Sequence, residues 1–270
     1  MNKYFSYLNK YFSYLTILIL TLGALSASRL LNSKEERSQY EIIQGSFMES
    51  NYVMLKIKNK NLEFIISKPI YDKATNKHYF EGQTTSQFLI SNEVDIAINT
   101  SPYGIKNNMF YPRGLYIYDK KIIFNERKDY GAIIIKNNEI ILNPKDDEIK
   151  NSEYGFSGFF PLIKNGKYIK NFKENKHPRT IIGTDKGNSY LYLITVEGRG
   201  TNNSKGISLN EAIDLSLSYG IINSINLDGG GSSTLVVKSN SSPYKLNTTS
   251  NLFGKERIIP FHLGIKLPNQ

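Results

Sequence analysis

Three consecutive glycines, at positions 229–231, constrain the fold of this chain more than any other feature. They stand between an acidic residue, Asp228, and three hydroxyl residues, Ser232, Ser233 and Thr234. Glycine reaches positive φ freely and lets a ligand approach the backbone closely, but inside regular structure it costs about 0.5–1 kcal/mol per residue. The run therefore predicts a loop, and a loop of this composition is typical of a binding site.

A helix and a strand are predicted immediately before the glycine run. Ser208 and Glu211 have the spacing of a capping box, an apolar stripe follows, and Gly220 is a helix stop. Residues 221–227 alternate in the manner of a strand, so the acid is expected at a strand end. A second strand, 234–238, is expected to leave the loop. The alternative is a tight hairpin with an Asx-type turn at the acid.

Short runs of β-branched and aromatic residues, separated by turn signals, fill most of the remaining chain. Such runs predict strands and several hairpins. We expect a single α+β domain with a mixed, largely antiparallel β-sheet core and a few packed helices. The strands are expected at residues 52–58, 61–66, 94–98, 114–118, 132–135, 139–142, 179–184, 190–197 and 258–266.

The first residues of the chain have the pattern of an export signal. Lys3 and Lys10 precede the apolar run 15–25, and small residues follow at 26–28. Because a spanning helix needs about 20 apolar residues, the run favours a cleaved signal peptide over a membrane anchor made of residues 11–31. The protein is therefore expected outside the cytoplasm, whether secreted, periplasmic or at the cell surface, with membrane contact only through an uncleaved anchor.

Three regions are expected along the chain. Residues 1–28 are the signal peptide or anchor, the polar and charged residues 29–50 are a linker, and residues 51–270 are the functional domain. A net charge of +10 is scattered among Lys- and Asn-rich turns. This scatter argues against a nucleic-acid partner, which needs a concentrated basic stripe.

The composition excludes several kinds of site. There is no cysteine, so disulfides, thiolate nucleophiles and thiolate zinc sites are excluded. His78, His177 and His262 lie far apart and form no HExxH pattern, so a histidine metal site is not expected. No cofactor is predicted, although Asp228 could ligate a hard cation such as Ca²⁺.

The glycine run has the chemistry of an anion site. Successive glycine amides can form a nest whose N–H groups point at an anion, and the hydroxyls at 232–234 would add donors. A phosphate-like group is the expected guest. The run is no Walker loop, because no Gly-Lys-Ser/Thr follows, and no dinucleotide fingerprint, because no helix opens here with the required spacing.

Two arginines flank one predicted hairpin. His177 and Arg179 stand before its first strand, and Glu197 and Arg199 follow its second strand. A guanidinium group matches phosphate bidentately, so both arginines are candidate phosphate ligands. The alternative is a surface ion pair with Glu197 or Glu256. His177 either packs on the sheet as a structural residue or titrates in the site.

Taken together, these segments resemble the phosphodiester glycosidase family. The matching segments are 177–180, 197–199, 206–209, 226–234 and 256–257, with weaker matches at 99–103 and 156–160. The resemblance covers roughly residues 90–265. It implies cleavage of a sugar-1-phosphodiester between the anomeric carbon and oxygen. Two details differ from the family pattern: Glu197 stands where the family usually has Asp, and Tyr103 stands where the family segment has Phe.

The resemblance also implies the residues of the site. Glycosidases commonly pair two carboxylates, so Asp228 is expected as the leading catalytic group, base or nucleophile, and Glu197 as the second. Because phosphate leaves well, arginine groups that stabilise the anion should matter more than acid assistance. The expected substrate-binding residues are Arg179, Arg199, Asn99, Asn226, Gly229, Gly230, Gly231, Ser232, Ser233, Thr234, His177 and Arg257.

The expected partner is a sugar phosphate or a phosphodiester-linked glycan of a surface or wall, with α-N-acetylglucosamine-1-phosphodiester as one candidate. Two other readings stay open at this point. The chain could be a non-catalytic protein that binds glycans or anionic polymers, or an exopolysaccharide biosynthesis or attachment factor. Metal dependence, stereochemical course and oligomeric state are not predicted.

Overall fold

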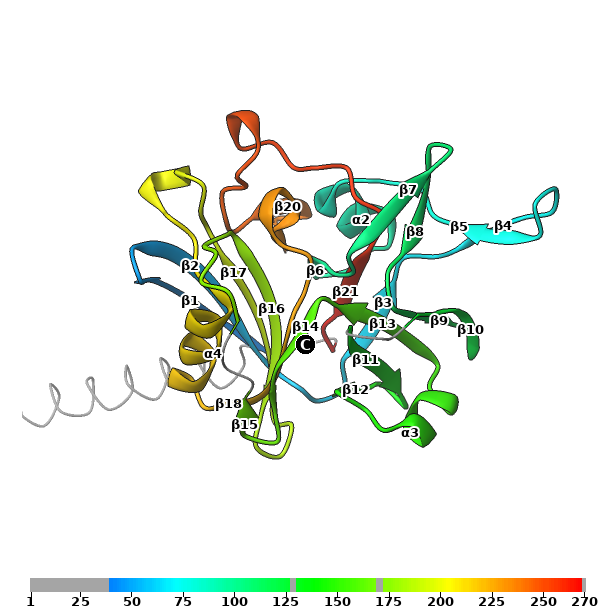
Figure 1. Ribbon diagram of the computed structural model, residues 1–270, viewed down its shortest axis with the longest axis horizontal. Helices are drawn as coiled ribbons and strands as arrows, with labels where there is room; N and C mark the ends of the chain where they lie inside the picture. Colours follow the sequence, from blue (N-terminus) through cyan, green and yellow to red (C-terminus); the bar gives the residue numbers. More distant parts are fainter. Residues whose placement is uncertain (1–38, 127–129, 169–171, 269–270) are drawn as a thin grey trace, which may run out of the picture. The chain divides into compact units, whose positions relative to one another are not determined.

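Antiparallel sheets dominate the structure, a computed structural model that describes residues 39–126, 130–168 and 172–268 (Figure 1). Residues 40–269 cluster as one compact unit. The predicted signal segment, 1–28, lies outside the described residues. Within the described ranges, no helix combines the length and the apolar character that crossing a membrane requires.

Three sheets form the core of this unit. The seven-stranded sheet has the order β1 (Tyr40–Phe47), β2 (Ser50–Lys58), β17 (Tyr190–Val196), β16 (Arg179–Asp185), β18 (Ile221–Asn226), β14 (Phe160–Lys164) and β15 (Lys167–Tyr168). One five-stranded sheet has the order β10 (Lys121–Asn125), β9 (Leu115–Tyr118), β13 (Tyr154–Gly158), β11 (Gly131–Lys136) and β12 (Glu139–Leu142). The other has the order β20 (Ser242–Lys245), β19 (Leu235–Ser239), β6 (Ile96–Asn99), β21 (His262–Lys266) and β3 (Glu63–Ile66).

Two hairpins and six short helices complete the described elements. The hairpins pair β4 (Ile70–Asp72) with β5 (Lys77–Tyr79), and β7 (Tyr103–Lys106) with β8 (Met109–Pro112). The α-helices are α2 (Thr85–Ser91), α3 (Asp146–Lys150) and α4 (Leu209–Ser218), and the 3₁₀ turns are η1 (Thr201–Asn203), η2 (Gly230–Ser232) and η3 (Leu252–Gly254). Every ladder between described strands is antiparallel, so the parallel pairs that a mixed sheet implies are not found among them.

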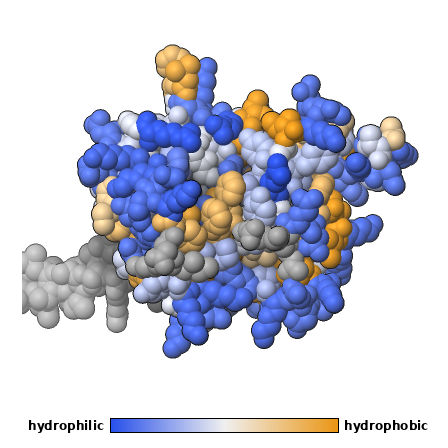
Figure 2. All heavy atoms as spheres, in the orientation of Figure 1, coloured by the Kyte–Doolittle hydropathy of each residue, from blue (hydrophilic) through white to orange (hydrophobic). Residues whose placement is uncertain are grey.

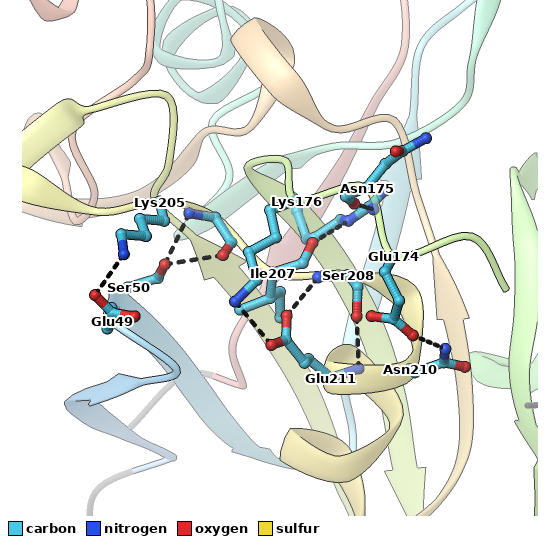
Figure 3. Close-up of polar contacts among 12 residues, drawn as sticks. Glu49, Ser50, Glu174, Asn175, Lys176, Lys205, Ile207, Ser208, Asn210 and Glu211 are labelled. Atoms are coloured by element: carbon cyan, nitrogen blue, oxygen red, sulfur yellow. Dashed lines mark hydrogen bonds and ion pairs between the residues drawn. The ribbon is translucent and has the colours of Figure 1, made fainter. Parts of the chain in front are cut away.

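The core lies where the three sheets meet. Its largest apolar cluster contains Leu193, Ile133 and Leu263, one from each sheet. Helix α4 covers the other face of the seven-stranded sheet, where its Ala212 and Ile213 join a second cluster (Figure 1). The predicted capping box of α4 is confirmed: Ser208 accepts from the Glu211 amide at 3.1 Å, and Glu211 accepts from the Ser208 amide at 2.7 Å (Figure 3).

Two further expectations from the sequence are wrong. Residues 40–47 of the predicted linker form strand β1, which pairs with β2 along its whole length. The charged residues 34–37 before β1 led to the linker prediction, although β1 itself contains Tyr40, Ile42, Ile43 and Phe47. The tight-hairpin alternative for the glycine run is also wrong, because β18 and β19 belong to different sheets.

A buried histidine should make the fold sensitive to acid. His262 stacks on Phe88 with ring centroids 4.8 Å apart, and its Nε2 has no hydrogen-bond partner among the described residues. Burial lowers the pKa of His262 to about 3. The unfolded chain binds this proton near pH 6.5, so below that pH the unfolded state takes up a proton that the folded state refuses. Stability is therefore full above about pH 6.5 and declines toward pH 3, by up to about 1.4 kcal/mol per pH unit.

Denaturant unfolding of the wild type and a His262→Phe variant between pH 7 and pH 4 measures this contribution. Phenylalanine can keep the stack on Phe88 but binds no proton. We expect the wild type to lose stability more steeply than the variant as the pH falls. Parallel curves would show that His262 does not contribute to the acid sensitivity.

Candidate active site

The glycine run carries the chain from the seven-stranded sheet to a five-stranded sheet. It passes tightly over the start of β16, where the Gly230 amide donates to the Pro178 carbonyl at 2.9 Å. A Cβ on Gly229 would lie 2.7 Å from the same carbonyl oxygen. A side chain at position 229 would therefore push the loop off this strand.

The other two glycines make room for guanidinium groups. Gly230 has φ +59°, and a Cβ there would lie 2.9 Å from Nη2 of Arg199. A Cβ on Gly231 would lie 2.3 Å from Nη2 of Arg257. The glycines thus bring two cations against the backbone of the loop.

This arrangement replaces the predicted anion nest. The Gly229 amide donates a hydrogen bond to the Asp228 carboxylate, and the Gly230 amide donates one to the Pro178 carbonyl. Two of the three glycine amides are therefore used inside the protein. The positive charge at the loop comes from Arg199 and Arg257 instead.

Asp228 is the carboxylate at the centre of this group. It accepts hydrogen bonds from the Ser232 side chain and the Gly229 amide, and the charge of Arg257 acts on it. Burial raises the pKa of Asp228 to about 6, against the lowering effect of these three partners. A carboxyl group with such a pKa can take or release a proton near neutral pH.

Tyr103 also belongs to the group, although it was not among the predicted site residues. Its side chain makes hydrogen bonds with Arg257 and Ser232, and burial and the charge of Asp228 raise its pKa. Arg257 Nη1 in turn donates to Ser232 Oγ at 3.5 Å. The signal was present in the family segment 99–103, but the usual Phe at this position has no hydroxyl. Ser232 therefore links Asp228 to both Tyr103 and Arg257.

Arg199 lies against Gly230, and its charge acts on His177. Arg199 has φ 58°, a left-handed conformation that it shares with residues in several turns of the protein. Burial lowers the pKa of His177, and the charges of Arg179 and Arg199 lower it further. His177 is thus held toward its neutral form beside two cations. Its backbone pairs with that of Ile207.

Arg179 is placed differently from the predicted phosphate ligand. Its Nε donates to the Ile207 carbonyl and its Nη2 to the Asn175 carbonyl, both at 2.9 Å. Burial lowers the pKa of Arg179 to about 10. Figure 3 shows Asn175 and Ile207 beside the N-terminus of α4, where Lys176 forms an ion pair with Glu211. The described contacts of Arg179 thus stabilise the segment before α4.

Glu197 is also placed differently from the predicted second catalytic carboxylate. It is buried, its Oε1 accepts from the Thr248 amide at 2.8 Å, and its Oε2 accepts from the Asn202 side chain at 2.9 Å. These contacts join the loop after β17 to the loop that carries Asn251 and Arg257. Both carboxylate oxygens therefore hold loops together.

Four other predicted ligands are buried beside the glycine run: Asn99, Asn226, Ser233 and Thr234. Asn99 accepts from the Thr180 hydroxyl and the Thr234 amide, both at 3.0 Å, and donates to the Asp228 carbonyl. Asn226 donates to the carbonyl of the following residue at 3.0 Å. The hydroxyl of Ser233 has no partner among the described residues. Asn99 therefore positions Asp228 through its backbone.

A second unpredicted residue, Asn251, anchors the loop over the glycines. Its amide donates to the Gly231 carbonyl at 2.7 Å and to the Lys255 carbonyl at 3.0 Å. Beyond it, Leu252 and Phe253 are 77% and 85% exposed. Figure 2 shows an apolar tip where this loop projects, above the glycine run in the orientation of Figure 1. The loop thus gives the candidate site an apolar rim.

Within the three described ranges, no group of three or more His, Asp or Glu side chains could hold a metal ion. The structure supplies Asp228 with hydrogen-bond donors and one guanidinium instead. Calcium binding at Asp228 stays a prediction, and the described residues place no group of further acidic or histidine ligands around Asp228.

Comparisons with known proteins concern the family and the fold of the chain. The chain matches the family model for phosphodiester glycosidases over residues 92–266. A 94-residue segment, 35% of the chain, is 39% identical to an SPbeta prophage-derived uncharacterized protein of Bacillus subtilis (strain 168), and spans 13% of that protein.

Two solved structures share the fold. The catalytic domain of zebrafish N-acetylglucosamine-1-phosphodiester α-N-acetylglucosaminidase, auto-inhibited by its pro-peptide, has a TM-score of 0.62 and 17% identity, covering 84% of this chain and 82% of that one. A protein of Burkholderia pseudomallei described as exported has a TM-score of 0.56 and 11% identity, covering 81% of this chain and 74% of that one. At identities of 17% and 11%, the similarity shows a shared fold alone.

Proposed function

Because this chain belongs to the phosphodiester glycosidase family, we propose that it hydrolyses a sugar-1-phosphodiester between the anomeric carbon and its oxygen. One observation carries the proposal. Asp228, with its raised pKa, lies in a network with Ser232 and Arg257, and two guanidinium groups flank the glycine run beside it. A carboxylate next to paired cations suits a reaction in which a sugar carbon is attacked and a phosphate departs.

The roles of the residues follow from their chemistry. Arg199 and Arg257 would bind the phosphate oxygens and stabilise the charge that they gain as the bond breaks. Ionised Asp228 would either take a proton from the attacking water or attack the anomeric carbon itself. Water supplies the new oxygen of the free sugar, and the phosphomonoester leaves as an anion without needing a proton. Arg179 and Glu197 would act as supports in this scheme.

We propose N-acetylglucosamine as the first sugar to test, and a glycan outside the cytoplasm as the natural substrate. The similarity in fold to the zebrafish enzyme supports the sugar. The export pattern of residues 1–28 and the fold shared with an exported bacterial protein support the location.

A product assay tests the proposal directly. The purified chain is incubated with a panel of sugar-1-phosphodiesters, with and without a chelator and with and without a glycan acceptor. Free sugar and phosphomonoester in equal amounts are the expected products. Sugar found on the acceptor would show transfer, and binding without any product would show a non-catalytic protein. One observation favours the non-catalytic outcome. Both carboxylate oxygens of Glu197 bind neighbouring loops, so among the described residues Asp228 is the one carboxylate in the network with Ser232 and Arg257.

The hydroxyl of Tyr103 provides a finer test of the network. A Tyr103→Phe variant keeps the ring and restores the usual family residue, but loses hydrogen bonds to Arg257 and Ser232. We expect kcat to fall about tenfold with a small change in KM, because one hydrogen bond to a charged group is lost. Tyr244→Phe, at an exposed tyrosine of β20, is the matched control. An unchanged kcat for Tyr103→Phe would remove the hydroxyl from the mechanism.

A further inference from the structure

A cavity of about 830 Å³ opens beside the β7–β8 hairpin, outside the network of Asp228. Residues 104–107, 109 and 111–113 of the hairpin and its flanks line the cavity, together with residues 75–78, 123, 124 and 126. Asp228, Ser232 and Arg257 do not line it. The β7 strand begins at Tyr103, so the same hairpin serves both places. The family comparison and the proposed reaction leave this cavity unexplained.

Its charged lining is strongly asymmetric. Lys77, Lys106 and Arg113 line the cavity, and Glu126 is the one acidic residue among its described lining residues. None of the three cations forms an ion pair with a carboxylate of the described residues. A concave surface lined by charge of one sign concentrates the opposite charge. The lining therefore favours an anion.

Gly104 leaves room for the side chain of Arg113. A Cβ on Gly104 would lie 3.1 Å from Nη2 of Arg113, so the guanidinium lies close over the strand. The backbone amide of Arg113 also donates to the Pro102 carbonyl at 2.9 Å. The glycine run uses the same device for Arg199 and Arg257. Here it makes room for the guanidinium of a residue that lines the cavity.

The uncharged lining suits a sugar. Tyr111 and Phe124 form an edge-to-face pair with ring centroids 6.2 Å apart, and the side chains of Asn76 and Asn107 add amide groups. Aromatic walls with a few polar groups are typical of sites that bind small organic ligands. Together with the three cations, which form no ion pair within the part of the chain that the structure describes, they match a sugar that carries a negative charge.

We propose that this cavity is a second, non-catalytic carbohydrate site that binds an acidic sugar unit, carrying a phosphate, sulfate or carboxylate group. It requires no turnover at Asp228. If the proposed function is right, the site would hold an acidic unit of the same glycan, away from the bond that is cleaved. The protein would then act on a charged polymer better than on a single sugar phosphodiester.

Binding of a sulfated dextran oligosaccharide, with uncharged dextran of the same length as reference, tests the site. A Lys77→Gln/Lys106→Gln variant removes two exposed cations of the cavity, and Lys164→Gln/Lys167→Gln removes two exposed cations of β14 and β15. We expect the cavity variant to bind sulfated dextran about tenfold more weakly, as two exposed charge contacts would give. The matched variant should bind like the wild type, and backbone amide NMR shifts should map to residues 104–113.

Three results would overturn the proposal: no preference of the wild type for sulfated over uncharged dextran, an equal loss in both variants, or shifts confined to residues 229–232. Turnover of a small sugar-1-phosphodiester separates this proposal from the proposed function. The cavity variant should retain that turnover if both are right. A wild type that binds sulfated dextran through residues 104–113 but releases no sugar would refute the enzyme and leave the second site standing.

Discussion

Replacing Asp228 by asparagine is expected to lower the turnover of a sugar-1-phosphodiester by about 10³-fold or more. Asparagine keeps the size of the side chain and one acceptor oxygen, so the bonds from Ser232 and the Gly229 amide can persist in part. It can neither take a proton nor attack carbon as a carboxylate does. The measurement is kcat/KM for release of free sugar by wild type and variant.

The pH profile provides an internal check on this variant. Because burial raises the pKa of Asp228 to about 6, kcat/KM of the wild type should rise with pH up to about 6 and level off above it. The residual rate of Asp228→Asn should lack this step. A wild-type rate that is highest well below pH 6 would show that Asp228 acts in its protonated form.

Stability provides the control for Asp228→Asn. A carboxyl group whose pKa is raised on folding stabilises the fold only while it is protonated, and this contribution is lost as the pH rises through about 6. At neutral pH the charged Asp228 is therefore a cost to stability that asparagine removes. We expect the variant to unfold at the same temperature as the wild type or higher. Full turnover by such a folded variant would refute the role of Asp228.

Replacing Gly231 by alanine is expected to reduce activity by about 10²–10³-fold, the effect of removing one group that stabilises the developing charge. The new Cβ would lie 2.3 Å from Nη2 of Arg257 and 2.3 Å from Oδ1 of Asn251. Both atoms end side chains, which can move aside more easily than backbone, although Asn251 would then weaken its anchoring bond to the Gly231 carbonyl. Arg257 would then leave its place beside Ser232. We therefore expect kcat/KM to fall strongly, and the unfolding temperature to fall less than in a variant whose new Cβ meets backbone.

Gly229→Ala is the matched comparison for this variant. Its Cβ would lie 2.7 Å from the Pro178 carbonyl, a backbone atom that also accepts the Gly230 amide. The backbone cannot move aside as a side chain can, so this variant should lose stability as well as activity. If Gly231→Ala destabilised the fold as much as Gly229→Ala, the glycine at 231 would be required for packing rather than for the place of Arg257.

Local signals in the sequence located many of the described elements. The capping box at Ser208 and Glu211 predicted α4, and alternating apolar runs predicted β2, β16 and β17 within a few residues. Helix α2 was not predicted, although Thr84 and Gln87 form a capping box that could have indicated it. Its seven residues are too short for a clear apolar period.

The site was predicted less completely than the strands. Asp228, the glycines, Ser232, Arg199 and Arg257 lie close to one another as the sequence indicated. Tyr103 and Asn251 were missed, because a lone tyrosine and a lone asparagine have no distinctive pattern. Arg179 and Glu197 were expected in the site, but their described hydrogen bonds support nearby segments.

The sequence by itself determined that a strand ends at an acid, that a glycine loop follows it, and that the chain belongs to its family. The strand and the loop depend on residues close together along the chain, where backbone preferences and spacing are decisive, and the family match rests on several short segments spread over residues 92–266. Tertiary structure alone decided what surrounds the loop. Whether an arginine faces the acid or a backbone carbonyl depends on the packing of segments as distant as Tyr103, Arg199 and Arg257. The same packing desolvates Asp228 and raises its pKa, and no local pattern specifies either.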